Sequence, residues 1–425
     1  MPIPRARRPL THRLHPLPAT RRPAYPSAAS GRRRSARLGA TARVGLLLIL
    51  LLHAPLPLSA QDAAGEPIRF ATFNAALSGE TADDLRQRLA DGSDADLQKV
   101  ARIVQQVRPD VLLLQEFDHD ASGELGRQFR RHYLEVAQGS GRPIHYAHAY
   151  APPVNTGLPT DLDLDGDGRS DGPGDAHGWG AYPGQYGMLL LSRYPVLTRE
   201  VIDRRDTVWG RLPFSLYPEA YYPAAARPAL RLSSKTHALV PLARGDERFA
   251  VLISHPTPPV FDGEEDRNGR RNFDEIGLLA QMVHRHDGPL VVMGDLNADP
   301  ADGESRRGAV DQLLQHTRLT DPAPTSAGAV AAAERDGGVN ADHRSDPARD
   351  TADWADHDGR GPGNLRVDYV LPSTEWTVAD AGVYWPTPDQ PDAALIEVSD
   401  HRLVWVDLFR QGPPPRNPRR APYGR

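Results

Sequence analysis

Seven short apolar runs constrain the fold class of this chain. Each has the length and composition of a buried β-strand. Between some of them, residues 97–107 and 274–284 place their apolar side chains on one face of a helix, and residues 308–316 do so more weakly. Asn272 or Asp274 is a suitable N-cap for the second helix. Strands that alternate with helices predict an α/β layered domain. The seven runs span residues 68–74, 111–117, 188–194, 249–255, 290–297, 366–373 and 401–408.

The first 60 residues differ in composition from the rest of the chain. They contain 11 arginines and no lysine or acidic residue, and an apolar run from Val44 to Leu52 precedes small residues near Ala60. This order is typical of a secretory signal and predicts a secreted or periplasmic protein. A disordered tail with an uncleaved anchor is the alternative. The basic part is long for a signal, which also fits a translation start further along the chain, near Val44.

The pattern of the chain after residue 60 predicts one large domain. We expect a signal peptide and basic leader over residues 1–60, a catalytic domain with long loop insertions over residues 61–410, and a disordered tail over residues 411–425. The chain has no cysteine, which excludes disulfides, zinc–thiolate sites and cysteine nucleophiles.

Charge bears on the choice of partner. Without the 11 leader arginines, 39 basic residues stand against 55 acidic residues, a net charge of −16. An acidic surface does not attract polyanions by bulk charge, so a nucleic-acid substrate is disfavoured without being excluded. After removal of the leader, we expect a monomer that does not insert into a membrane.

Polar residues stand at or near the ends of the predicted strands. A carboxylate in such a place, as at Asp295, is costly unless it is paired. Taken singly, an asparagine there is usually a turn residue, and a histidine is more often a structural hydrogen-bonder than a catalyst. The joint pattern favours a shared site, because strand ends of layered α/β folds are where ligands bind. The residues are Asn74, Glu116, His255, Asp295, Asn297, Asp368, Asp400 and His401.

The residue types indicate the chemistry of such a site. Glu116, Asp295 and Asp400 are hard oxygen ligands that suit Mg²⁺ or Mn²⁺. Asn74 and Asn297 can hold a phosphate oxygen or a water without adding repulsion.

The two histidines complete this chemistry. His255 and His401 can donate to a developing oxyanion, and Asp368 could fix one imidazole and raise its basicity. A buried carboxylate–histidine pair of this kind is strengthened by the low dielectric of the interior.

These segments resemble, in order, the metal-dependent endonuclease/exonuclease/phosphatase superfamily. The resemblance implies a four-layer α/β sandwich in which two mixed β-sheets pack face to face with helices outside. It also implies hydrolysis of a phosphoester by in-line attack of water, with no covalent enzyme intermediate. The matching segments are FATFNAAL (70–77), LLLQEFD (112–118), YGMLLLSRYPV (186–196), LISHP (252–256), VMGDLNADP (292–300), RVDYVL (366–371) and VSDHRLVWVDL (398–408).

The same resemblance implies roles for single residues. Glu116 would hold the metal, with Asn74 beside it and Asp400 completing its surroundings. Asp295 would orient or activate the attacking water, and Asn297 would hold the phosphate.

The resemblance assigns the remaining residues to the phosphoryl group. His401, supported by Asp368, would stabilise the phosphoryl oxygen, and His255 matches the second histidine of the deoxyribonuclease-like branch. Tyr186 lies where a phosphate-contacting aromatic is often found.

The sequence is compatible with three functions. A secreted phosphatase or phosphodiesterase is preferred, and an extracellular nuclease of the same fold is the alternative. A non-catalytic calcium- or phosphate-binding surface protein is the alternative of another class.

An acidic loop at residues 161–175 predicts a second metal site. Asp163, Asp165, Asp167 and Asp171 occupy positions 1, 3, 5 and 9 of a calcium-loop pattern and resemble the loops of EF-hand-like and dockerin-like sites. The final bidentate glutamate of that pattern is missing. A structural Ca²⁺ and a merely solvated acidic loop are the two interpretations.

Two further insertions offer substrate contacts. Arg270 and Arg271 could clamp a phosphate if their loop folds over the strand ends, or they could be solvated charges at a helix start. Aromatic residues between 203 and 230 could stack on a substrate, or could fix a long loop to the domain.

Overall fold

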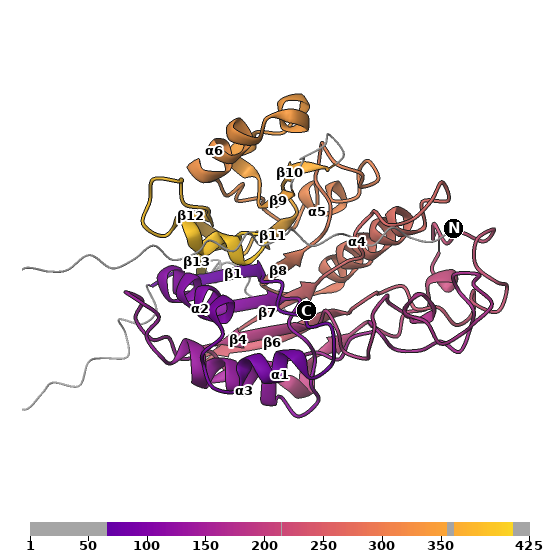
Figure 1. Ribbon diagram of the computed structural model, residues 1–425, viewed down its shortest axis with the longest axis horizontal. Coiled ribbons are helices and arrows are strands. Elements are labelled where there is room, and N and C mark those ends of the chain that lie inside the picture. Colours follow the sequence, from indigo (N-terminus) through magenta and orange to yellow (C-terminus); the bar gives the residue numbers. More distant parts are fainter. Residues whose placement is uncertain (1–65, 214, 355–360, 411–425) are drawn as a thin grey trace, which may run out of the picture. The chain divides into compact units, whose positions relative to one another are not determined.

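A computed structural model describes residues 66–213, 215–354 and 361–410 (Figure 1). The predicted leader, its alternative start near Val44 and the predicted C-terminal tail lie outside the described residues. Within the described part of the chain, no helix combines the length and apolar character needed to cross a membrane.

All seven predicted runs form strands, and the three predicted helices are present. The helices are α1 (Asp84–Leu89), α2 (Ala95–Val107), α3 (Glu124–Phe129), α4 (Arg267–Arg285), α5 (Asp311–Leu314) and α6 (Ala327–Asp336). The strands are β1 (Ile68–Asn74), β2 (Val111–Gln115), β3 (His148–Tyr150), β4 (Met188–Ser192), β5 (Ile202–Asp203), β6 (His237–Arg244), β7 (Glu247–Ser254), β8 (Leu290–Asp295), β9 (Ala352–Trp354), β10 (Gly363–Leu365), β11 (Asp368–Pro372), β12 (Trp376–Tyr384) and β13 (Leu403–Arg410).

The strands form two large sheets and one small one. The first sheet has six strands in the order β12-β13-β1-β2-β4-β3, and the second has five in the order β11-β8-β7-β6-β5. Strands β9 and β10 pair with each other. Strands β1 and β2 run parallel, as do β7 and β8, while the other pairs are antiparallel. The prediction of two mixed β-sheets is therefore confirmed.

Alternation along the strands separates the apolar residues into layers. Phe70 and Leu113 of the first sheet share a buried cluster with Val251 and Met293 of the second, so the two sheets pack face to face. The opposite faces of the sheets lie under helices: residues of α1, α2 and α3 cover the first sheet, and residues of α4 and α5 cover the second. The period-two pattern of each strand thus produces the predicted four-layer sandwich.

Some element boundaries differ from the prediction. Helix α4 begins at Arg267, with Asp266 at its N-cap position, so neither Asn272 nor Asp274 caps it. The Asn272 amide instead donates to the carbonyls of Thr257 and Leu296, each at 2.9 Å. The N-cap prediction was wrong because the helix begins before Asn272 and Asp274, which both lie inside it.

Two long strands escaped sequence analysis. Strand β6 contains Pro241 in its interior, which argues against a strand in sequence reading. Strand β12 is an edge strand whose middle is largely exposed, so its polar residues gave no apolar run.

The strand directions bring the polar residues together at one edge. Asn74 pairs in register with Gln115, and Asp295 pairs with Asp368. Just before Asp295, a β-carbon at Gly294 would lie 2.0 Å from the carbonyl oxygen of Ser254. Only glycine allows β7 and β8 to approach so closely at this point.

Candidate active site

The carboxylate of Asp295 is the centre of the site. Its Oδ2 lies 3.1 Å from Asn74 Nδ2, 3.3 Å from His255 Nε2 and 3.7 Å from His401 Nε2. Its Oδ1 accepts a hydrogen bond of 2.8 Å from the backbone N–H of Asn297. Burial opposes ionisation of Asp295, but the two histidines outweigh it and hold the pKa of this carboxyl well below its ordinary value. The group is therefore an ionised carboxylate inside the fold.

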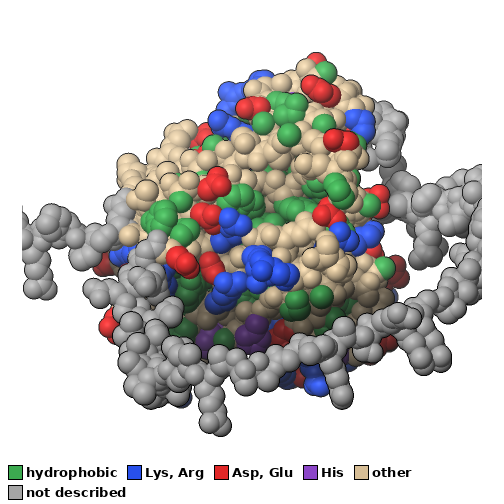
Figure 2. Space-filling view, turned by 90° about the vertical axis from the view of Figure 1, so that its left-hand side faces the viewer, with side chains coloured by type: hydrophobic (Ala, Val, Ile, Leu, Met, Phe, Trp, Pro, Cys, Tyr) green, Lys and Arg blue, Asp and Glu red, His purple; other side chains and the backbone are tan. Residues whose placement is uncertain are grey.

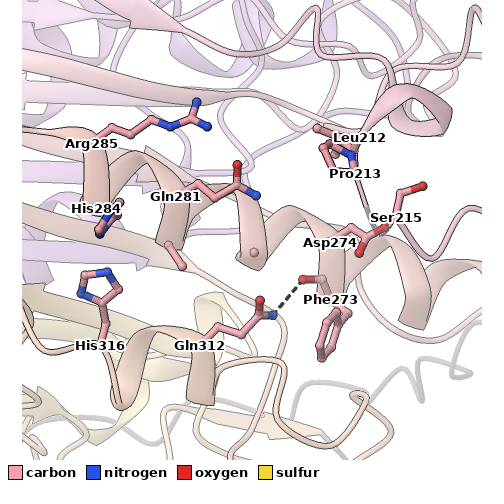
Figure 3. Close-up of a pocket in the computed structure, with 12 residues that line it drawn as sticks. Leu212, Pro213, Ser215, Phe273, Asp274, Gln281, His284, Arg285, Gln312 and His316 are labelled. Carbon is pink, nitrogen blue, oxygen red and sulfur yellow. Dashed lines mark hydrogen bonds between the residues drawn. The ribbon is translucent and has the colours of Figure 1, made fainter.

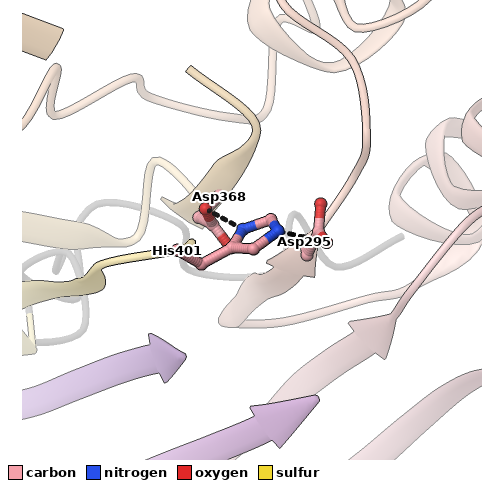
Figure 4. A group of neighbouring side chains, drawn as sticks. All are labelled: Asp295, Asp368 and His401. Atoms are coloured by element: carbon pink, nitrogen blue, oxygen red, sulfur yellow. Dashed lines mark hydrogen bonds and ion pairs between the residues drawn. The ribbon is translucent and has the colours of Figure 1, made fainter. Parts of the chain in front are cut away.

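His401 lies between two carboxylates (Figure 4). Its Nδ1 is 2.9 Å from Asp368 Oδ2, and the Thr351 hydroxyl donates to the same oxygen at 2.8 Å. Burial disfavours a charged ring, but Asp368 and then Asp295 raise the pKa of His401 well above its ordinary value. The imidazolium form is favoured, so both ring nitrogens can donate.

The second histidine, His255, favours the neutral form of its ring. Burial, reinforced by the nearby Lys235 ammonium, lowers the pKa of His255. Its Nδ1 is buried and has no hydrogen-bond partner among the described residues. If Nε2–H donates to Asp295, this Nδ1 is a free acceptor that a water or substrate hydroxyl could satisfy.

Glu116 and Asn74 lie on the other side of Asp295. The Asn74 amide donates to Glu116 Oε1 at 3.2 Å as well as to Asp295, so one amide joins the two carboxylates. Glu116, Asn297 and Tyr186 have φ angles of +55°, +51° and +54°, respectively. Left-handed backbone is unfavourable for residues that carry a β-carbon, and its concentration at this site is typical of a functional centre.

Asp400 is exposed beside His401. Its Oδ2 accepts a hydrogen bond of 2.8 Å from Trp354 Nε1, and the Trp354 ring meets the His401 ring edge-on, with centroids 5.3 Å apart. Asp400 adds to the charge that favours the His401 imidazolium.

Two groups of side chains in the described residues have donor atoms close enough to hold one metal ion. The first is Asp295, Asp368 and His401, which already bind one another through hydrogen bonds and ion pairs. Glu116 offers a better opening, because it is partly exposed and, in the described part of the chain, the Asn74 amide is the sole donor to its carboxylate. A carboxylate next to an amide fits Mg²⁺ or Mn²⁺, which keep several waters and few protein ligands.

Lys235 was not among the site residues predicted from the sequence, and the residue is 6% exposed. Burial lowers the pKa of its ammonium group, and the carboxylates of Glu275, Glu116 and Asp295 oppose that shift. The composition contained a signal for this residue: the chain has 50 basic residues, and only Lys99 and Lys235 are lysines. A compact ammonium in a chain that otherwise uses arginine indicates a specific local need.

The second group with metal-binding potential lies in the acidic loop. It consists of Asp163, Asp165 and Asp175. Asp171 instead pairs with Arg169 at 2.8 Å, and Asp167 accepts from the Arg169 backbone N–H. The donor atoms of Asp167 and Asp171 lie outside this group, because the chain turns back after Pro173.

That turn explains why Asp175 lies in this group. It brings Asp175 against the start of the loop, where Oδ1 accepts from the Leu164 N–H at 2.8 Å. Asp175, and neither Asp167 nor Asp171, therefore lies in one group with Asp163 and Asp165.

The predicted arginine clamp is not part of the cluster. Arg271 is buried, and its guanidinium donates to the carbonyls of Leu232 at 2.7 Å and Arg231 at 2.9 Å and also to that of His177. Arg270 Nε donates to the Glu265 carbonyl at 3.0 Å. Arg271 therefore holds loops in place, because its Nε and Nη2 donate to main-chain carbonyls.

The aromatic residues of the 203–230 insertion pack mainly on one another. Trp209 is fully buried, and its ring lies 5.3 Å from that of Tyr217 and 6.3 Å from that of Tyr222. They fix this loop to the domain, which is the second of the two interpretations.

A pocket of about 590 Å³ lies elsewhere, along α4 and α5 (Figure 3). His284, Gln281 and His316 are among the side chains that line it. None of the residues gathered around Asp295 does so. This pocket is separate from the candidate site.

One buried carboxyl adjoins the site without joining it. Asp350 is 2% exposed and precedes Thr351, and its Oδ1 has no hydrogen-bond partner among the described residues. Burial raises the pKa of Asp350 to about 8, and the carboxylates of Asp299, Asp302 and Asp346 add to the shift.

Comparison with known proteins gives a family match. A family model described as the Endonuclease/Exonuclease/phosphatase family matches residues 71–401, more than half of the chain. A search of curated proteins found no match.

Several solved structures are similar at low identity. An endonuclease/exonuclease/phosphatase from Beutenbergia cavernae DSM 12333 is 17% identical, with a TM-score of 0.47, 82% of this chain covered and 72% of that one. A family protein from Leptotrichia buccalis C-1013-b is 13% identical, with a TM-score of 0.43 and coverage of 80% and 98%. The human Nocturnin catalytic domain with bound sulfate is 18% identical, with a TM-score of 0.42 and coverage of 80% and 94%.

The raised pKa of Asp350 should make the stability of the fold depend on pH. Between about pH 4, where the unfolded carboxyl ionises, and about pH 8, the folded state holds a proton that the unfolded state has lost. Stability from this group therefore falls as pH rises through that window. We expect Asp350→Asn to raise the unfolding free energy at pH 8 by about 1–3 kcal/mol and to change it little near pH 4.

Urea unfolding at several pH values measures this difference. The matched control is Asp246→Asn, which alters an exposed acid in the turn between β6 and β7. Parallel pH curves for Asp350→Asn and the parent protein would show that Asp350 is ionised in the fold.

Proposed function

The chain belongs to the endonuclease/exonuclease/phosphatase family, whose members hydrolyse phosphoester bonds, and we propose that it is a secreted, divalent-metal-dependent phosphohydrolase. The observation that carries the proposal is the convergence on Asp295. Asn74, His255 and His401 reach this one carboxylate from three other strand ends. Such a group can orient a water molecule and accept its proton.

Asp295 is suited to orienting a water molecule because it stays ionised inside the fold. Its Oδ2 is shared among donors, and its Oδ1 is held by the Asn297 backbone. The carboxylate therefore cannot rotate away from the strand end. A fixed acceptor supports in-line attack, in which the water must lie opposite the leaving group.

His401 and Lys235 supply positive charge close to Asp295. The His401 imidazolium, held by Asp368, can donate Nε2–H to a phosphoryl oxygen as negative charge develops. The buried Lys235 ammonium adds a second charge near the same carboxylates. Asn297 and Tyr186, which adjoin the site, are proposed to contact the phosphate.

Glu116, with Asn74 beside it, would hold Mg²⁺ or Mn²⁺, and Asp400 would add negative charge to its surroundings. Such an ion, when bound, neutralises charge on the phosphoryl group in the transition state. The partly exposed Glu116 carboxylate and its short link to Asp295 support this placement.

We favour a phosphatase or phosphodiesterase over a nuclease that tracks long nucleic acids. The chain without its leader has a net charge of −16. On the face drawn in Figure 2, acidic and basic side chains lie interspersed. A protein that follows a duplex needs a basic track. Secretion is proposed from the leader sequence alone.

Removal of the Asp295 carboxylate tests the proposal. We expect Asp295→Asn to lower kcat/KM by about 10²–10⁴-fold, because the base is lost while its shape is kept. Release of product from bis-p-nitrophenyl phosphate, p-nitrophenyl phosphate and plasmid DNA, each with Mg²⁺, Mn²⁺ or Ca²⁺, measures the effect. The control is Asp246→Asn, with circular dichroism to confirm folding.

Two results would contradict the proposal. Near-normal turnover by folded Asp295→Asn would remove Asp295 from the chemistry. Absence of turnover by the parent protein on all three substrates would favour the non-catalytic binding protein.

We also propose that the acidic loop binds a structural Ca²⁺ through Asp163, Asp165 and Asp175. Ca²⁺ should raise the melting temperature by about 2 °C or more, and Asp165→Ala should abolish the rise. Asp171→Ala is the matched control, because Asp171 pairs with Arg169. Measuring the melting temperature by calorimetry in a Glu116→Gln variant limits any contribution from Ca²⁺ bound at the active site. An equal rise in Asp165→Ala would exclude this loop.

A further inference from the structure

Trp179 is a large aromatic side chain that is 59% exposed. Its loop is nevertheless fixed at the preceding residue: Gly178 N–H donates to the Asn155 carbonyl at 3.1 Å, and the Gly178 carbonyl accepts from Gly157 N–H at 2.9 Å. A β-carbon at Gly178 would lie 2.1 Å from the Ser234 carbonyl oxygen, so the loop is pressed against the residue before Lys235. An indole held in water on an ordered loop is a pre-organised contact surface.

The Trp179 ring does not stand alone. Its centroid lies 6.2 Å from that of the Tyr186 ring, and the two ring planes are tilted by 33°. Tyr186 N–H donates to Ser78 Oγ at 3.0 Å, and Ser78 Oγ donates to the Glu116 carbonyl at 3.0 Å. The aromatic pair therefore adjoins the segment that carries Glu116, at the rim of the candidate active site.

The geometry of the pair selects among ligands. Rings this close to parallel present flat faces in similar directions, which suits a planar ring. A quaternary ammonium headgroup is bound in a cage of rings set at steep angles, usually with a free carboxylate nearby. Of the two acids beside Tyr186, Glu116 is the proposed metal ligand. Asp118 already accepts from the Tyr182 hydroxyl at 2.7 Å and from the N–H groups of Gly79 and Tyr186, each at 3.2 Å. A neutral aromatic ring fits these surroundings better than a cation.

We propose that Trp179 and Tyr186 form a stacking subsite for an unpaired nucleobase, so that the substrate is a nucleoside phosphoester. This inference rests on the proposed function, because the base is placed by the phosphate that the Asp295 cluster binds. The acidic net charge favours a nucleotide or a short strand end over a duplex. Trp179 acts in specificity and not in bond cleavage.

Two phosphodiesters with the same leaving group test the subsite. Thymidine 5′-(p-nitrophenyl phosphate) carries a base, and methyl p-nitrophenyl phosphate does not. In the full chain with Mg²⁺ or Mn²⁺, we expect the parent to prefer the thymidine ester. Trp179→Ala should lower the ratio of the two kcat/KM values about tenfold, equivalent to about 1.4 kcal/mol. Trp179→Phe should restore most of the ratio.

The matched control is Phe261→Ala, which removes another exposed aromatic ring, 85% exposed, and should keep the parent ratio. A parent without preference, or an unchanged ratio in Trp179→Ala, would overturn the subsite. Selective loss with p-nitrophenyl phosphorylcholine instead would assign the pair to a choline headgroup and also overturn it.

Failure of the proposed function gives a different result. A parent that hydrolyses neither these esters nor bis-p-nitrophenyl phosphate, p-nitrophenyl phosphate or plasmid DNA refutes the phosphohydrolase. Calorimetric binding of thymidine 5′-monophosphate then decides about the subsite. About tenfold weaker binding by Trp179→Ala supports it, and equal affinity overturns it.

Discussion

An ionised carboxylate buried at the end of a core strand is the constraint around which this structure is organised. Taking a carboxylate out of water is expensive unless hydrogen bonds and opposite charge replace the solvent. At Asp295 these come from Asn74, His255 and His401, which lie far away in the sequence. The Ser399 hydroxyl adds a brace, because it donates to the Asn74 carbonyl at 2.7 Å and accepts from His401 N–H at 3.0 Å.

The sandwich supplies the geometry that makes this compensation possible. Parallel pairing of β1 with β2, and of β7 with β8, sends four strand ends to one edge of the two sheets. The antiparallel neighbours β11 and β13 begin at that edge, which places Asp368 opposite Asp295 and His401 close by. The two carboxylates then set the charge of the histidine between them. The packing of the sheets therefore determines the electrostatics of the site.

Much of this arrangement could be predicted from the sequence. The apolar runs indicate buried strands, and the polar residues at their ends indicate where the site lies. The runs identified seven strands and the residues that meet at Asp295. What escaped prediction depends on long-range contacts. Asp175 lies beside Asp163 and Asp165 because the loop turns back, and the Arg271 guanidinium donates to carbonyls of distant loops. Lys235 follows no motif, and only the scarcity of lysine marked it.

Asp295 and His401 form an ion pair at 3.7 Å, and we propose that they act as one unit in hydrolysis. A double-mutant cycle on kcat/KM, with Asp295→Asn, His401→Asn and the double variant, measures their coupling. If the pair is one unit, the double variant should lose about as much as the more damaging single variant, since either change alone disables the unit. Losses that simply multiply would show that the two side chains act independently and would contradict the claim.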